Sequence, residues 1–181
     1  PDDWACTRDN NAGLMWEVKR NSGLRAQSHT YTWRFDGVGN TGGSSSCGNT
    51  LSQCNTAAYV ARINAEQLCG SSDWRLPGGS YQIGFANDSP NGELAVFYQN
   101  FFDTSDVDSS MWFPNTRKFW HWTRIRDPFN FGRVWVVHFE DGRVFSNFWD
   151  FDYPIRLVTN VSADDDEGSN IAPQEDISGT V

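Results

Sequence analysis

The segment RVWVVHFEDGRVFSNFW, residues 133–149, decides the fold of this chain. Asp141 and Gly142 form the strongest short signal for a hairpin, and aromatic and β-branched residues lie on both sides of them. A two-residue turn at this point pairs Phe139 with Val144. Both faces of the hairpin are then largely apolar, which predicts that the hairpin lies in the centre of its sheet.

Further strands are predicted on both sides of this hairpin. Residues 14–18 and 31–35 are rich in aromatic and β-branched side chains, and turn signals separate them. Residues 155–158 form a last short apolar run. The chain therefore begins and ends with strands.

Two helices are predicted between these strands. Residues 55–70 have small and apolar residues at helical spacing, with Asn55 able to cap the start and Gly70 placed to end the helix. Residues 89–101 have a second apolar stripe, which begins after Pro90. The order of strands, helices and strands predicts an α+β domain with two helices packed on antiparallel sheets.

The composition is that of one globular domain with an unusual number of aromatic residues. The chain has 181 residues, of which 38% are hydrophobic, and it contains nine Trp, five Tyr and 13 Phe. This is more Trp than one core needs, so we expect some aromatic side chains to serve a surface. No apolar run is long enough to cross a membrane, which takes about 18 residues.

The charge is distributed unevenly along the chain. The net charge is −9, which argues against binding to nucleic acid because such binding depends on basic residues. Residues 162–181 contain six acidic residues and no Lys or Arg, whereas seven of the 14 basic residues lie between Arg117 and Arg156. We therefore expect a binding domain at residues 1–161 and, at residues 162–181, an acidic linker that leads to a further domain.

The four cysteines indicate disulfides and an oxidising compartment. They have no metal-binding spacing, and four cysteines allow three pairings. We favour Cys47 with Cys54, which closes a short polar loop, and this leaves Cys6 with Cys69. Four reduced thiols are the alternative.

The sequence offers no pattern of an enzyme or a metal site. His29, His121 and His138 lie in no hydrolase or metalloprotease motif, and we expect His138 to pack opposite Phe145. The acidic run at residues 164–167 lacks the spacing of a calcium loop. We therefore expect no catalytic residue, no cofactor and no metal ion.

Two clusters rich in aromatic residues, at residues 119–131 and 147–153, are the candidates for a binding surface. Neighbouring side chains of a strand face opposite ways, so only one face of such a cluster can fill the core. Trp and Arg are the residues most enriched at binding hot spots, and buried arginines would each need a partner. The predicted ligand-binding residues are Trp120, His121, Trp122, Arg124, Arg126, Phe129, Phe131, Asn147, Trp149, Asp150, Asp152 and Tyr153.

Several motifs occur in the order typical of one protein family. They are GLMWEVK at residues 13–19, LCG at 68–70, DWRLP at 73–77 and WVVHF at 135–139. On these motifs the chain resembles the Lcl C-terminal domain family over residues 4–158. The resemblance implies a secreted or surface domain with a C-type-lectin-like fold. Members of the family are mostly binding modules, and its namesake is an adhesin that recognises sulfated glycans.

The chain departs from the family pattern in two places, and both bear on the ligand. Residues 78–92 are inserted after the DWRLP motif, and residues 120–124 are bulkier than the family's usual residues. The namesake's ligand is therefore not carried over. The resemblance also predicts that residues 4–6 and 155–158 are adjacent strands, because C-type-lectin-like domains bring their ends together.

The sequence favours a non-enzymatic, adhesin-like domain, extracellular or on a bacterial cell surface, that recognises a glycan or a protein of a host or neighbouring cell. The binding surface of such a domain would include an exposed Trp122. Replacing Trp122 and Arg124 with Ala should therefore abolish binding without lowering the melting temperature. The alternative is a subunit or tip module of a cell-surface filament, with the aromatic patch as the interface of a homo-oligomer. An enzyme of the formylglycine-generating type is the third hypothesis, and it would need reactive thiols.

Overall fold

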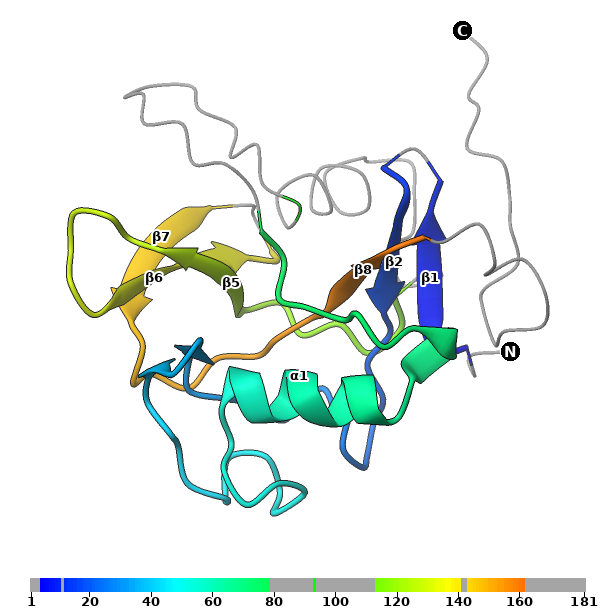
Figure 1. Ribbon diagram of the computed structural model, residues 1–181, viewed down its shortest axis with the longest axis horizontal. Coiled ribbons are helices and arrows are strands. Elements are labelled where there is room, and N and C mark those ends of the chain that lie inside the picture. Colours follow the sequence, from blue (N-terminus) through cyan, green and yellow to red (C-terminus); the bar gives the residue numbers. More distant parts are fainter. Residues whose placement is uncertain (1–3, 11, 79–92, 94–112, 141–142, 162–181) are drawn as a thin grey trace, which may run out of the picture.

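A computed structural model describes residues 4–10, 12–78, 93, 113–140 and 143–161 (Figure 1). Within this part the chain forms three antiparallel sheets and one α-helix, which fits an α+β fold. The predicted second helix, at residues 89–101, lies outside the described residues except for Glu93. None of the described helices is long and apolar enough to cross a membrane.

The first sheet joins the two ends of the described chain. It consists of β1 (Cys6–Asp9), β2 (Leu14–Glu17) and β8 (Val158–Asn160), in the order β1-β2-β8. The prediction that the first and last strands are adjacent is therefore wrong, because β2 lies between them. All four residues of β2 are buried, and a strand without an exposed side chain suits the centre of a sheet.

The second sheet contains the hairpin that the sequence predicts. Its order is β5 (Trp120–Arg126), β6 (Arg133–His138) and β7 (Val144–Phe148). Val144 pairs with Val137, not with Phe139 as predicted, so the register differs by two residues and a longer connection replaces the two-residue turn. A shift of two leaves every side chain on its predicted face. Among the described strands β6 is central and β7 lies at the edge, so the prediction of a fully central hairpin is wrong.

Phe139 explains this shift in register. Its side chain is buried, and its ring stacks on that of His121 with the centroids 3.9 Å apart. Its backbone N–H donates to the carbonyl oxygen of Phe119, at 3.1 Å. Phe139 therefore fills the core beside β5 instead of extending the ladder with β7.

The helix α1 (Thr56–Ala65) begins where the sequence predicts and ends earlier. The side chain of Asn55 accepts a hydrogen bond from the backbone N–H of Ala58 at 2.9 Å, which caps the first turn. Beyond the helix, Gln67 and Cys69 have left-handed φ angles of 48° and 51°. Residues 66–70 therefore leave the α-helix, and a short 3-10 helix, η1 (Leu68–Gly70), brings Cys69 to Cys6.

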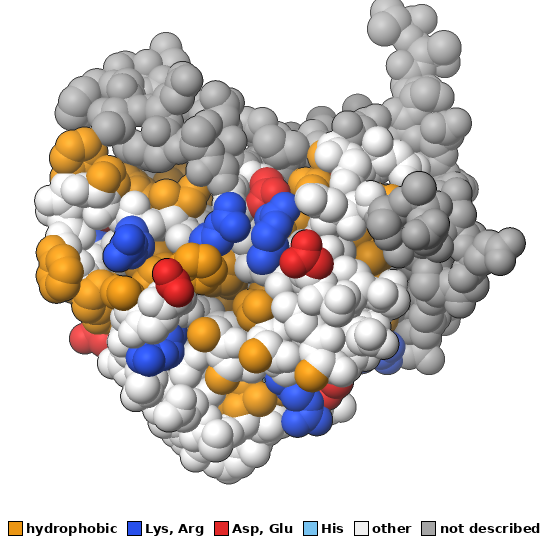
Figure 2. Space-filling view, in the orientation of Figure 1, with side chains coloured by type: hydrophobic (Ala, Val, Ile, Leu, Met, Phe, Trp, Pro, Cys, Tyr) orange, Lys and Arg blue, Asp and Glu red, His pale blue; other side chains and the backbone are white. Residues whose placement is uncertain are grey.

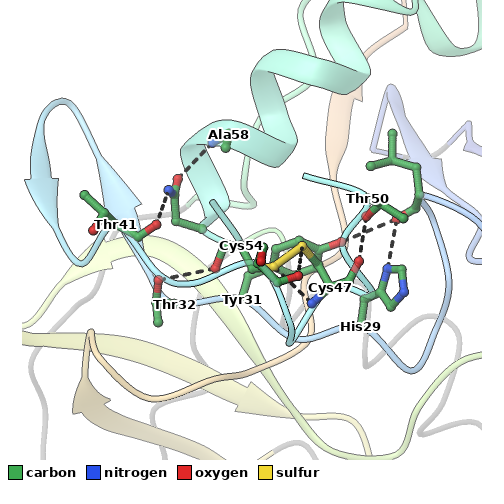
Figure 3. Close-up of a disulfide and its surroundings, with 11 residues drawn as sticks. His29, Tyr31, Thr32, Thr41, Cys47, Thr50, Cys54 and Ala58 are labelled. Atoms are coloured by element: carbon green, nitrogen blue, oxygen red, sulfur yellow. Dashed lines mark hydrogen bonds between the residues drawn. A yellow bond between two sulfur atoms is a disulfide. The ribbon is translucent and has the colours of Figure 1, made fainter. Parts of the chain in front are cut away.

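Both disulfides have the favoured pairing, Cys6 with Cys69 and Cys47 with Cys54. The second closes a polar loop before α1 (Figure 3). Inside this loop the hydroxyl of Thr50 donates to the carbonyl oxygen of Cys47 at 2.7 Å, and the carbonyl oxygen of Cys54 accepts from the backbone N–H of Thr32 at 3.0 Å. The loop is thus fixed by hydrogen bonds as well as by its disulfide.

A network of buried charges is centred on Glu17, the last residue of β2. The carboxylate of Glu17 has no exposed side-chain area, and it lies 2.9 Å from the ammonium group of Lys19 and 3.7 Å from Nε of Arg25. The hydroxyl of Tyr59 also donates to this carboxylate. Burial lowers the pKa of Lys19 to about 8, although the charge of Glu17 opposes this shift. Both charged residues of the GLMWEVK motif therefore lie in the core with its apolar residues.

Candidate functional site

The loop between β5 and β6 presents two phenylalanines to solvent. The carboxylate of Asp127 accepts hydrogen bonds from the backbone N–H of Phe129 at 3.0 Å and from the side-chain amide of Asn130 at 2.9 Å. The loop is closed by the backbone N–H of Asp127, which donates to the carbonyl oxygen of Arg133 at 2.9 Å. These bonds hold Phe129 and Phe131 outward, with 68% and 91% of their surface exposed.

An open depression of about 630 Å³, which we call the aromatic pocket, lies beside this loop. Residues 126–133 and Trp149 line it. The rings of Phe131 and Trp149 meet edge to face with centroids 5.4 Å apart, and the guanidinium group of Arg133 lies 4.4 Å from the ring centroid of Phe148. The pocket therefore combines aromatic walls with an arginine at each end of the loop.

A second depression of about 340 Å³, which we call the arginine pocket, adjoins the first. It lies between β5 and the small hairpin of β3 (Arg34–Phe35) and β4 (Val38–Gly39). Its lining residues are Phe35, Asp36, Val38, Arg124 and Arg126. Arg126 lines both pockets and so joins them. Figure 2 shows this face, on which several Lys or Arg side chains lie among hydrophobic ones.

The position of Arg124 depends on a bulge in β5. Trp122 pairs with Val136 and Arg126 with Val134, so four steps along β5 correspond to two steps along β6. Inside this bulge the backbone N–H of Arg124 donates to the carbonyl oxygen of Pro77 at 2.8 Å. The bulge turns the Arg124 side chain out to solvent.

Five of the twelve predicted ligand-binding residues line the two pockets. The structure brings together Arg124, Arg126, Phe129, Phe131 and Trp149. Asp150 and Asp152 are exposed but lie outside both pockets. Arg124 and Arg126 are both exposed, which confirms the expectation for these two arginines of β5.

The expectation that Trp122 is exposed is wrong. Its side chain is fully buried, and its indole N–H donates to the carbonyl oxygen of Tyr31 at 2.7 Å. Its ring packs on that of Tyr153, which is also buried, with centroids 4.9 Å apart. Because hydrophobic clusters cover both faces of the second sheet, β5 has no free face between His121 and Thr123.

Three other predicted residues hold the structure together and lie outside the pockets. The half-buried Trp120 packs edge to face on His138, with ring centroids 4.8 Å apart. The side-chain amide of Asn147 donates to the hydroxyl of Tyr153 at 2.5 Å. His121 is buried against Phe139, so the expectation that it serves recognition at the surface is wrong.

The burial of His121 makes stability depend on pH. Burial, followed by the charge of Arg156, holds the pKa of His121 well below its usual range. The unfolded chain then binds a proton near pH 6.5 that the folded chain does not bind, so stability is lost as the pH falls below about 6.5. We expect urea unfolding to show this loss between pH 7.5 and 5.5 in the wild type and a smaller one in His121→Gln. Equal slopes in the two proteins would contradict the assignment.

The sequence did not indicate several of the residues that line the pockets, among them Phe35, Asp36, Val38 and Arg133. Phe35 and Val38 flank a turn in which Asp36 and Gly37 have φ angles of 49° and 77°, as a tight hairpin turn requires. The Asp-Gly pair signals this turn, but no local signal places it beside β5. No local signal indicates Arg133 either, because it belongs to the site only through Trp149 and Phe148, which lie near it in space.

The described residues contain no group of three or more His, Cys, Asp or Glu side chains that could hold a metal ion. The inserted residues 78–92, which the sequence analysis relates to the choice of ligand, lie outside the described residues apart from Gly78. The two pockets are therefore the candidate site that the structure supports.

Comparison with known families supplies the broader context. The model of the Lcl C-terminal domain matches residues 5–159. Comparisons with curated proteins and with solved structures found no match. The family and the two disulfides indicate an extracellular or cell-surface protein. Because the match spans most of its length, the chain belongs to the Lcl C-terminal domain family.

Proposed function

We propose that this domain is a non-enzymatic, adhesin-like binding module that recognises a glycan or a protein through the aromatic and arginine pockets. One observation carries the proposal: two open pockets, joined at Arg126, are lined by highly exposed aromatic rings and exposed arginines. A large exposed apolar group on a soluble domain marks an interaction site. A C-type-lectin-like fold would be consistent with this role.

The chemistry of the pockets suits a ligand with both apolar and polar faces. The rings of Phe129, Phe131 and Trp149 offer flat apolar surfaces, on which the C–H face of a sugar or an apolar side chain can pack. The guanidinium groups of Arg124 and Arg126 offer hydrogen-bond donors to hydroxyl, carbonyl or carboxylate oxygens. We infer that the aromatic pocket supplies most of the affinity and the arginines the orientation.

A filament subunit is the second candidate, and the edge of β7 disfavours assembly by strand addition. At the two ends of the β6–β7 ladder, the backbone N–H of His138 donates to the carbonyl oxygen of Arg143, and that of Trp149 donates to Gly132. Residues bonded to the partner strand alternate with residues that point away from it, so the backbone groups of residues 144, 146 and 148 point away from β6. The outward carbonyl of Ser146 already accepts from Arg133 at 2.9 Å. The backbone N–H of Phe148 donates to its neighbour Asn147 at 2.9 Å. Side chains of the same chain thus occupy groups that an added strand would need.

A paired substitution in the pockets tests the binding function. We expect Phe131→Ala and Arg126→Ala each to weaken binding about 30-fold, since a hot-spot truncation costs about 2 kcal/mol. Binding would be measured on a glycan array and against immobilised cell-surface proteins. Because both side chains are exposed, the melting temperature should change by less than about 2 °C.

Phe145→Ala is the matched control for this test. Phe145 is 51% exposed but lies outside both pockets, so its replacement should leave binding unchanged. If Phe145→Ala weakens binding as much as Phe131→Ala does, the ligand contacts another surface. If both pocket variants bind every ligand as tightly as the wild type, the proposed site is wrong.

A further inference from the structure

A continuous row of contacts leads from the end of the last strand to the arginine pocket. Asn160, the last residue of β8, accepts a hydrogen bond from Nη2 of Arg75 at 3.1 Å. Arg75 also forms a bidentate ion pair with Glu93, at 2.6 and 2.7 Å. The carboxylate of Glu93 in turn accepts from the backbone N–H of Gly78 at 2.5 Å. These contacts fix the segment after the DWRLP motif beside the end of β8.

Gly78 connects this row to Arg124. A Cβ atom at Gly78 would lie 2.8 Å from Nη2 of Arg124, so the guanidinium group lies directly against the glycine. Arg124 and Arg126 then line the arginine pocket together. We call Arg75, Arg124 and Arg126 the arginine row.

The charges along the row are not balanced by the described residues that line it. Glu93 neutralises Arg75. Asp36 is the one acidic residue among the described residues that line the arginine pocket, against two arginines that are both exposed. The pocket therefore has an excess of positive charge and can accept a further carboxylate.

The sequence supplies carboxylates close to this place. Residues 164–167 are Asp164, Asp165, Asp166 and Glu167, and no Lys or Arg follows them up to residue 181. Asp164 is four residues beyond Asn160, so an extended chain allows it to reach about 13 Å and Glu167 to reach about 24 Å. Gly78 is three residues from Arg75, a span of at most about 10 Å. The acidic run can therefore reach Arg124 and Arg126 of its own molecule.

We propose that residues 164–167 bind Arg124 and Arg126 of the same molecule and occupy the arginine pocket until a ligand displaces them. The tether makes this contact intramolecular, with an effective concentration in the millimolar range. Weak ion pairs are then sufficient to fill the pocket, and a ligand that also uses the aromatic pocket can compete. The binding of the acidic run to the arginines does not depend on the proposed function, whereas its competition with a ligand rests on that function.

Zero-length cross-linking of the full chain tests the contact directly. A carbodiimide condenses a carboxylate and a touching amine into an amide with loss of water. The chain has two lysines, the buried Lys19 and the exposed Lys118, so an added amine is easily traced. The variants Arg124→Lys and Arg126→Lys keep the charge and introduce that amine. Peptide mapping by mass spectrometry would then locate each link, and gel electrophoresis would separate monomers from dimers.

We expect links from position 124 or 126 to residues 164–167, within monomers and at least fivefold more abundant than links from Lys118 to the same residues. They should weaken in 0.5 M NaCl, because salt screens exposed charges. Changing residues 164–167 to Asn, Asn, Asn and Gln removes the carboxylates that the carbodiimide activates, so this variant is the blank for the peptide mapping. Links no more frequent than those of Lys118, or found only in dimers, would overturn the proposal.

A binding measurement separates this inference from the proposed function. If both hold, the variant with residues 164–167 neutralised should bind the glycans or proteins found by the array more tightly than the wild type. If the array finds no ligand, the proposed function fails while the cross-links stand. If ligands bind but the cross-links are absent, the acidic run does not occupy the pocket.

Discussion

Trp122→Ala is expected to lower the free energy of unfolding by about 3–5 kcal/mol, the range for removing a large aromatic side chain from a core. The whole side chain of Trp122 is buried in the main hydrophobic cluster, against Tyr153. The substitution also leaves the carbonyl oxygen of Tyr31 without its indole donor. For a chain of this size the melting temperature should fall by about 10 °C or more. Thermal unfolding followed by circular dichroism would measure the change.

Phe131→Ala serves as the control for this experiment. Phe131 is an aromatic residue on the neighbouring loop, but 91% of its surface is exposed. Its replacement should change the free energy of unfolding by less than about 0.5 kcal/mol. A stable Trp122→Ala variant would show that the core does not depend on this side chain. The two variants thus separate the residue that stabilises β5 from the residue that is offered to a ligand.

Glu17→Gln is expected to cost about 3–5 kcal/mol of stability, because it removes the buried negative charge that faces Lys19 and Arg25. Glutamine keeps the volume of the side chain, so the loss would report charge and not packing. The carboxylate also accepts a hydrogen bond from the backbone N–H of Leu157 at 3.2 Å, next to the last strand. Denaturant unfolding at pH 7 would measure the effect.

The exposed ion pair of α1 provides the matched control. Glu66 lies 2.6 Å from Nε of Arg62, and the two side chains are 42% and 55% exposed. An exposed pair of this kind contributes about 0.3–0.5 kcal/mol, so Glu66→Gln should cost no more than that. If Glu17→Gln were as mild as Glu66→Gln, the buried network would not stabilise the fold.

Part of the fold could be read from the sequence because local chemistry decides it. Asn55 caps α1 through its own side chain, and the short loop between Cys47 and Cys54 favours their disulfide. The Asp-Gly turn signal at residues 141–142, with aromatic and β-branched residues on both sides, identifies two paired strands in residues 133–148. These features depend on residues within a few positions of each other, so the sequence alone was sufficient for them.

Register and burial depended on residues far apart in the chain. The turn signal at residues 141–142 predicts a tight hairpin, but Phe139 leaves the ladder because it packs on His121 of another strand. The helix stops short of its predicted end because Cys69 must reach Cys6, 63 positions away. In each case a tertiary contact outweighed a local preference worth about 1 kcal/mol or less.

The candidate site shows the same division. The sequence by itself determined that residues 119–131 and 147–153 contain more aromatic and basic side chains than a core requires. Only the tertiary structure decided which of them are exposed, because the bulge in β5 turns Arg124 outward while the main hydrophobic cluster buries Trp122. It also decided that Phe35 from a distant hairpin completes the arginine pocket. A binding surface is assembled from separate segments, and their distance in space is fixed by packing, which no single segment encodes.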